Sequence, residues 1–151
     1  MQILTATYNE QEMCALAARL AKLLRGGDCL TFNGTLGAGK TTFIRAMVQS
    51  LAGVENVPSP TFTLVQIYDS PIGSLWHFDL YRLKQPEDIY ELGIEEALAD
   101  GVLFIEWPQR AKELLPTNQL QLHLDHMPDT DGRTITITGE AQWATRLASL
   151  N

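Results

Sequence analysis

The chain is 151 residues long, a length that predicts one domain over residues 1–151 with roughly two thirds of its unfolded surface buried. Hydrophobic residues make up 45% and charged residues 19%, and neither a signal pattern nor an apolar run near the roughly 20 residues of a membrane span is visible, so we expect a cytoplasmic protein. The net charge of -7, with basic residues that are scattered singly, argues against direct tight binding to nucleic acid.

The first part of the chain predicts a helix, a strand, a glycine loop and a second helix. Asn9 can cap a helix whose apolar residues recur at helical spacing until Gly26 and Gly27 end it. The segment "DCLTFNG" (28–34) is short and mostly apolar, as in a buried strand, and "KTTFIRAMVQSLAG" (40–53) is typical of a helix that ends at a glycine. The glycine-rich stretch therefore connects a strand to a helix.

The middle of the chain predicts a hairpin, a helical region and a buried strand. An alternating strand begins at about Phe62, and "SLWHFD" (74–79) follows a turn as its antiparallel partner. A helical region over 86–100, interrupted at Gly93, comes next. The segment "VLFIE" (102–106) is almost continuously apolar, which is typical of a central parallel strand.

The last part of the chain predicts a second hairpin and a short amphipathic helix. The segments 120–127 and 133–139 alternate strictly around the turn residues "PDTDG", and the helix covers 140–150. Together the elements predict a three-layer α/β fold whose sheet is mixed, partly parallel and flanked by antiparallel hairpins.

The stretch "GTLGAGKT", Gly34 to Thr41, matches the pattern G-x-x-x-x-G-K-[ST] in the strand–loop–helix context that this pattern requires. The glycines let the backbone wrap around phosphate oxygens, and the start of the following helix adds its positive end. We expect Lys40 to reach the β- and γ-phosphates and the Thr41 hydroxyl to bind Mg²⁺. The motif therefore predicts the P-loop NTPase class of α/β fold.

Two carboxylates, Asp79 and Glu106, each end an apolar strand, which is the usual setting of the acid that accompanies a phosphate loop. Glu106 follows what we expect to be the more uniformly buried strand, so we place it near the metal and assign Asp79 to orienting the attacking water. The residues alone leave these two roles exchangeable. Lys40, Asp79 and Glu106 are the candidate catalytic residues.

Other polar and aromatic residues have two interpretations each. Thr61, in the proline-rigidified loop "SPTFT", either senses the γ-phosphate through the metal or is a turn threonine. Trp107 is either a lid over the site or part of the core. His77, His123 and His126 show no metal-ligand spacing and are interpreted as structural, and strand alternation in "HLDH" is expected to place His and Asp on opposite faces.

The expected nucleotide is ATP, because guanine-specific switches carry an Asn-Lys-x-Asp segment and the dipeptide Asn-Lys does not occur in the chain. A small-molecule kinase with the same loop is the alternative, but it needs an arginine-bearing lid, and the arginines here are dispersed. Arg82 could stabilise charge beside Asp79, although nothing marks it as an arginine finger. Slow hydrolysis completed by a partner is therefore favoured, and a nucleotide-binding scaffold without turnover is a third possibility.

Acidic residues accumulate between Lys84 and Arg110, an interval that contains no other Lys or Arg. We interpret most of this interval as a solvated acidic face, with partner docking as the more specific alternative. Its acidic members are Glu87, Asp88, Glu91, Glu95, Glu96, Asp100 and Glu106.

Four motifs, "GTLGAGKTT", "SPTFTLV", "HFDLYRL" and "IEWP", resemble the TsaE (YjeE) family in their order and separations, over about residues 9–110. The resemblance implies a P-loop α/β fold and a weak ATPase that uses Mg²⁺. It also implies work beside TsaB and TsaD, with TsaC upstream, in threonylcarbamoyladenosine modification next to the anticodon of tRNAs that read codons beginning with A. On this view the protein contacts tRNA only indirectly, does not bind a membrane and is a monomer when alone.

The resemblance also implies which residues of this sequence form the site. It implies that the phosphate loop binds ATP through residues 37–42, which are Gly37, Ala38, Gly39, Lys40, Thr41 and Thr42. It places Thr41 and Glu106 around the magnesium and requires Asp79 for activity. Arg133 is carried over as a further nucleotide contact, and Thr35 departs from the acidic residue that is common at its position.

Overall fold

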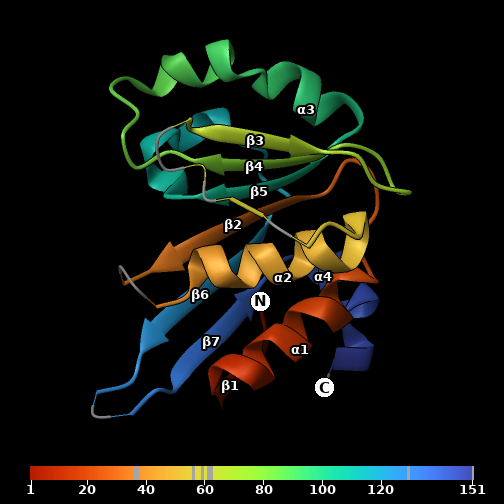
Figure 1. Ribbon diagram of the computed structural model, residues 1–151, viewed down its shortest axis with the longest axis vertical. Helices are drawn as coiled ribbons and strands as arrows, with labels where there is room; N and C mark the ends of the chain where they lie inside the picture. Colours follow the sequence, from red (N-terminus) through yellow and green to blue (C-terminus); the bar gives the residue numbers. More distant parts are fainter. Residues whose placement is uncertain (36–37, 56, 59, 61–62, 129, 151) are drawn as a thin grey trace.

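One mixed sheet runs through the part of the chain that the structure, a computed structural model, describes (Figure 1). The described residues are 1–35, 38–55, 57–58, 60, 63–128 and 130–150. The strands are β1 (Gln2–Tyr8), β2 (Cys29–Gly34), β3 (Val65–Tyr68), β4 (Leu75–Asp79), β5 (Val102–Glu106), β6 (Leu120–His126) and β7 (Arg133–Thr138).

The strand order is β1-β7-β6-β2-β5-β4-β3. β2 pairs in parallel with β5 and β6, and β5 pairs in parallel with β4. The pairs β3–β4, β6–β7 and β1–β7 are antiparallel. This topology confirms the mixed, partly parallel sheet, both predicted hairpins and the central parallel strand "VLFIE".

Most helical segments lie in the predicted regions, but the first helix ends at Ala21, before the expected glycines, and the short segments over 108–110 and 112–114 were not predicted. The segments are α1 (Glu10–Ala21), α2 (Lys40–Ala52), η1 (Pro86–Leu92), α3 (Ile94–Asp100), η2 (Pro108–Arg110), η3 (Lys112–Leu114), α4 (Ala141–Arg146) and η4 (Ala148–Leu150), where η marks a 3₁₀ helix. Asn9 caps α1 as expected, because its side chain accepts a hydrogen bond from the Glu12 N–H at 2.8 Å while the Glu12 side chain accepts from the Asn9 N–H at 2.9 Å. Gly53 ends α2 in a left-handed conformation.

Two hydrophobic cores lie on opposite faces of the sheet, which makes the fold three-layered. Helices α1, α2 and α4 cover one face, where Phe32 of β2 packs near Phe43 of α2 with ring centroids 5.7 Å apart. Segments η1 and α3 cover the other face, where Trp76 and Phe78 of β4 are buried. In Figure 1, α1 and α2 lie in front of the strands, and η1 and α3 run beside the β3–β4 hairpin.

Two strands differ from the sequence expectation. Strand β1 was not predicted, and it lies at the sheet edge, where its side chains are only partly buried or exposed. The strand expected from about Phe62 begins at Val65 in the structure, and Phe62 lies outside the described residues. An edge strand buries little apolar surface, so its sequence pattern is weak.

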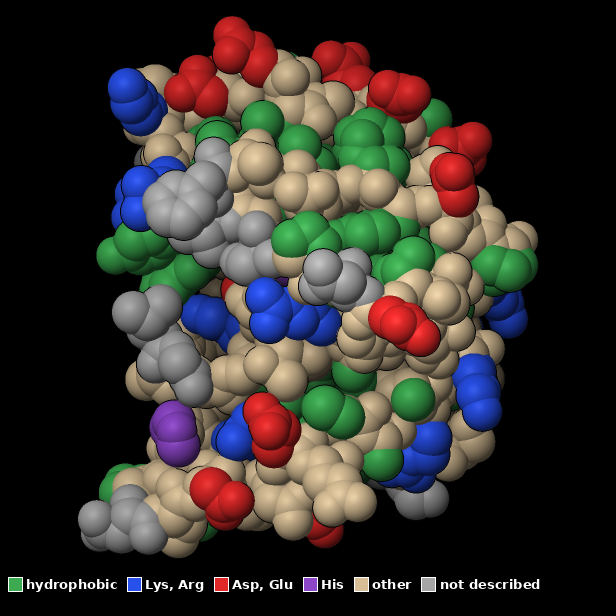
Figure 2. All heavy atoms as spheres, in the orientation of Figure 1, with side chains coloured by type: hydrophobic (Ala, Val, Ile, Leu, Met, Phe, Trp, Pro, Cys, Tyr) green, Lys and Arg blue, Asp and Glu red, His purple; other side chains and the backbone are tan. Residues whose placement is uncertain are grey.

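The surface over η1 and α3 is acidic, as the sequence predicted. Figure 2 shows acidic side chains gathered along this edge of the molecule. The exposed members are Glu87, Glu91, Glu95, Glu96 and Asp100, whereas Glu106 is buried elsewhere with 3% of its surface exposed. None of the helices in the described ranges combines the length and apolar character that a membrane crossing requires.

Candidate functional site

The phosphate loop lies where the carboxyl end of β2 meets the start of α2. Gly34 ends β2 with φ 130°, and a Cβ atom there would lie 1.8 Å from the carbonyl oxygen of Leu124, so this position requires glycine. Gly39 directly precedes α2 with φ 101°. Ligands of α/β proteins bind at the carboxyl ends of parallel strands, so the motif lies at the end of the sheet where such a site forms.

Lys40 is 4% exposed and its Nζ donates a hydrogen bond to the Gly34 carbonyl at 2.9 Å. The same nitrogen lies 3.9 Å from the centroid of the Trp107 ring. Burial lowers the pKa of Lys40 from its ordinary value of 10.5, and the carboxylates of Glu106 and Asp79 oppose part of that shift. Among the described residues this buried cation has one carbonyl partner and a ring beside it, an arrangement that is well suited to an anionic ligand.

Thr41 and Glu106 are in direct contact although 65 positions separate them in the chain. The Thr41 hydroxyl lies 2.9 Å and 3.0 Å from the two carboxylate oxygens of Glu106, to which it donates. Thr41 stands in the first turn of α2 and Glu106 at the carboxyl end of β5, and β5 is the direct neighbour of β2. The structure therefore brings the two predicted metal-site residues together.

Asp79 lies beside Glu106, because the two residues are register partners at the carboxyl ends of β4 and β5. It is 6% exposed, and its Oδ1 accepts a hydrogen bond from the Tyr81 N–H at 3.1 Å. All residues of both strands are buried, so the expected difference in burial that separated the roles of Asp79 and Glu106 was wrong. The contact with Thr41 distinguishes Glu106 instead.

His77 is the residue at this site that the sequence interpretation missed. Its side chain is fully buried, and its Nε2 lies 2.7 Å from Oε2 of Glu106. The available signal was its spacing, since His77 and Asp79 are two residues apart on one strand and share a face. The prediction for "HLDH" was also wrong for His123, which shares a face with Asp125 and lies 2.9 Å from its carboxylate.

Arg133 reaches the phosphate loop from β7. A Cβ atom on Gly39 would lie 2.9 Å from its Nη1, so the guanidinium lies directly against the loop backbone. Its Nη2 donates to the Asp131 carbonyl at 2.8 Å, and its Nη1 lies 3.7 Å from the Met13 sulfur. The structure thus places this residue next to the other candidates.

The remaining predicted residues have different outcomes. Ala38 is fully buried, and Thr42 is half-buried in the first turn of α2. Gly37 and Thr61 lie outside the described residues, so their predicted roles stay predictions.

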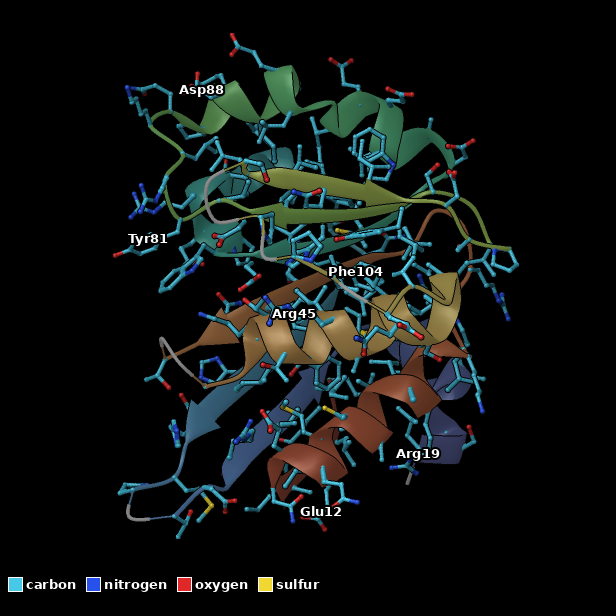
Figure 3. The ribbon with its side chains drawn as sticks, viewed as in Figure 1. Glu12, Arg19, Arg45, Tyr81, Asp88 and Phe104 are labelled. Carbon is cyan, nitrogen blue, oxygen red and sulfur yellow. The ribbon has the colours of Figure 1, made fainter. Side chains whose placement is uncertain are left out.

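Trp107 combines the two interpretations that the sequence left open. It packs against the second core and also covers the Lys40 amine. Its ring lies 4.9 Å from that of Tyr81, which is 46% exposed, and the Arg110 guanidinium lies 5.6 Å from the Tyr81 ring. Figure 3 shows Tyr81 on the loop after β4, at the end of the sheet where α2 begins. The rings of Tyr81 and Trp107 therefore form a continuous contact from the surface to Lys40.

The donors present suit a magnesium ion that is shared with a bound nucleotide. The described residues contain no group of three or more His, Cys, Asp or Glu side chains that could hold a metal without other ligands. Mg²⁺ usually keeps several waters and takes one or two protein oxygens together with substrate phosphates. The hydroxyl of Thr41 and the carboxylate of Glu106, next to a phosphate loop, fit that requirement.

Known proteins resemble this chain over most of its length. The family model described as "Threonylcarbamoyl adenosine biosynthesis protein TsaE" matches residues 7–135. The tRNA threonylcarbamoyladenosine biosynthesis protein TsaE of Rickettsia bellii is 42% identical over 137 residues, which cover 90% of this chain and 94% of that protein. The Bacillus subtilis protein of the same name is 37% identical over 138 residues, covering 91% and 85%.

A solved structure agrees with these sequence matches. The crystal structure of Bacillus subtilis YdiB superposes with a TM-score of 0.77 and 29% identity, covering 99% of this chain and 95% of that one. The matches confirm the family resemblance, and the structural neighbour confirms the P-loop NTPase class of fold.

Proposed function

The chain belongs to the TsaE family, which acts in tRNA threonylcarbamoyladenosine biosynthesis, and we propose that it does so as a magnesium-dependent ATPase with slow intrinsic turnover. The observation that carries the proposal is the contact of Thr41 with Glu106 beside the buried Lys40 amine. These three side chains are the phosphate-binding and metal-binding groups that a P-loop ATPase needs.

The chain's own groups have separate roles in this proposal. Backbone N–H groups of the loop, including that of Gly39, bind phosphate oxygens at the positive end of α2. The Ala38 N–H, which donates to the Thr35 carbonyl at 3.1 Å in this structure, would exchange that partner for a phosphate oxygen. Lys40 holds the charge of the β- and γ-phosphates, and Arg133 adds a second cation against Gly39. In the same proposal Gly37 and Thr42 extend the phosphate contacts, and Thr61 senses the γ-phosphate.

The two carboxylates differ in what they contact. Glu106, together with the Thr41 hydroxyl, would hold Mg²⁺, which when bound neutralises charge on the phosphates. Asp79 lies beside this pair and is assigned to orienting the water that attacks the γ-phosphate. Trp107 covers Lys40 and helps to exclude bulk water from the phosphates.

The proposal includes partner proteins and a place of action. The protein works in the cytoplasm as a single domain, monomeric when alone, with TsaB and TsaD, while TsaC acts upstream. It contacts tRNA only through this assembly, a view that the net charge of -7 supports. ATP binding and hydrolysis would reset the assembly between rounds of modification.

The test combines binding, hydrolysis and reconstitution. Calorimetry should detect uptake of ADP and ATP with Mg²⁺, and Lys40→Ala should weaken that uptake by about a hundredfold, because a buried charge-assisted contact is lost. Lys84→Ala, at an exposed lysine, is the matched control and should bind normally. With TsaB, TsaC, TsaD and tRNA, several rounds of modification should require the wild-type chain.

Three outcomes would contradict the proposal. The first is folded protein that takes up neither ADP nor ATP with Mg²⁺ present. The second is normal multiple-turnover modification supported by Lys40→Ala. The third is phosphate transfer to a metabolite instead of release into water, which would identify a small-molecule kinase.

A further inference from the structure

A buried histidine holds the carboxylate that faces Thr41. His77 has no exposed surface, and its Nε2 lies 2.7 Å from Oε2 of Glu106. Glu106 also accepts from the Thr41 hydroxyl at 2.9 Å and 3.0 Å. The carboxylate is therefore fixed from two sides, by a strand and by the first turn of α2.

The sheet register explains why the ring lies there. His77 pairs with Phe104 on β5, so Glu106 is its diagonal neighbour two residues further along that strand. Alternation along β4 places His77 on the same face as Asp79, the face that α2 covers. A side chain at this position contacts the Glu106 carboxylate and is shielded from solvent.

The hydrogen-bond partners assign the tautomer of the ring. A carboxylate oxygen can only accept, so Nε2 of His77 carries the hydrogen and donates to Glu106. The other ring nitrogen, Nδ1, is buried without a hydrogen-bond partner among the described residues. A hydrogen on Nδ1 would be a buried donor without an acceptor, which is the more costly arrangement.

We propose that His77 is a positioning residue that keeps the Glu106 carboxylate directed at Thr41, so that a magnesium–nucleotide complex meets a preset pair of oxygen ligands. Glutamate has three side-chain torsions, and without a second partner its carboxylate could turn away from Thr41. Hydrogen bonds to metal-binding groups commonly fix those groups and strengthen metal binding. The inference rests on the proposed function, because it concerns the magnesium that the proposed ATPase uses.

The test separates metal binding from nucleotide binding. ADP affinity is measured by calorimetry first in EDTA and then as Mg²⁺ is added to the wild type, His77→Leu and His77→Gln. His77→Leu removes the donor by replacing the ring with an apolar side chain of similar size, and His77→Gln keeps an N–H near the position of Nε2. Thermal unfolding shows which variants are folded.

Removal of the donor should raise the Mg²⁺ concentration at half effect by about 10-fold to 100-fold, with ADP affinity in EDTA unchanged within about twofold. His77→Gln should restore most of the loss. If His77→Leu does not fold, His77→Asn takes its place, since its amide is one methylene too short to reach Oε2 of Glu106.

The outcomes distinguish this inference from the proposed function. If the ADP affinity of the wild type does not change when Mg²⁺ is added, the proposed function is overturned. If Mg²⁺ raises the ADP affinity of the wild type, and the variant without the donor responds at the same Mg²⁺ concentration, only the role of His77 is overturned. An equal loss of ADP affinity in EDTA and in Mg²⁺ for the variant without the donor would also overturn it, because that result would show a general packing role.

Discussion

Two buried groups of charged side chains lie at opposite ends of β2, and they differ in how fully their members are paired. At the amino end, Asp28 accepts two hydrogen bonds from Arg146, at 2.6 Å and 3.0 Å, and one from the Arg25 N–H at 2.7 Å. Arg146 also donates to the Leu23 carbonyl at 3.3 Å and lies over the ring of Trp143, 4.1 Å from its centroid. This group fastens the C-terminal helix to the rest of the fold.

The group at the carboxyl end keeps unused bonding capacity. Among the described residues, the buried Lys40 amine donates to one carbonyl oxygen, and burial lowers its pKa. Nε of Arg133 is buried without a hydrogen-bond partner among the described residues. Buried charge is thus structural where its partners satisfy it, and it is available for a ligand where they do not.

The largest effect is expected on stability, from removal of the ion pair at the amino end of β2. Asp28→Ala should lower the free energy of unfolding by about 3 kcal/mol, because Arg146 would keep a largely buried charge without its partner. ADP affinity in Mg²⁺ should not change. Denaturant unfolding and calorimetry measure the two quantities.

Asp69→Ala is the control for this variant, because Asp69 is exposed and its replacement should cost no more than about 0.5 kcal/mol. Lost ADP binding in a folded Asp28→Ala protein would show that the two ends of the sheet do not have separate roles.

The next effect sharpens the difference between the two carboxylates of the site. Asp79→Asn should slow ATP hydrolysis by about a hundredfold, since a neutral amide oxygen orients water less strongly than a charged carboxylate, while ADP affinity keeps its response to Mg²⁺. Glu106→Gln should instead weaken that response. Phosphate release and ADP calorimetry, run on both variants, give the comparison.

The roles of the carboxylates would be exchanged if Asp79→Asn lost the response to Mg²⁺ and Glu106→Gln kept it. If the two variants show the same changes in hydrolysis and in Mg²⁺ response, the two carboxylates do not have separate roles.

The smallest effect concerns Lys40 and pH. The folded pKa of Lys40 lies below its unfolded value near 10.5, so the unfolded chain binds more protons in the interval just below that value. The penalty for burying the charge is therefore present at neutral pH and is relieved as pH rises toward 10.5. The stability of the wild type relative to Lys40→Met should rise over this interval in denaturant unfolding. A constant or falling difference would contradict the burial argument.

The sequence predicted most of the fold, because the elements that form the core carry strong periodic patterns. The phosphate loop was recognisable because only its glycines permit the backbone of Gly34 and Gly39. Strand β1 was missed because an edge strand has a weak pattern, and the parallel pairing of β2 with β6 joins distant segments. Local signals do not record such pairings.

The site was predictable where a motif or a strand end marks it, as for Lys40, Thr41 and Glu106. The contact of His77 with Glu106 depends on the register between β4 and β5, which the sequence of either strand does not contain. The roles of the two carboxylates could not be separated by burial, since both strands are fully buried. Three-dimensional contacts were needed to tell them apart.

The antiparallel pairing of β1 with β7 has a consequence for biosynthesis. Residues Gln2–Tyr8 leave the ribosome early, but their partners Arg133–Thr138 emerge only after most of the chain has been made. At about 5–20 residues per second, the nascent strand waits on the order of ten seconds for its partner. Throughout that delay it is an unpaired hydrogen-bonding edge, open to nascent-chain chaperones or to misassembly with a neighbouring polypeptide.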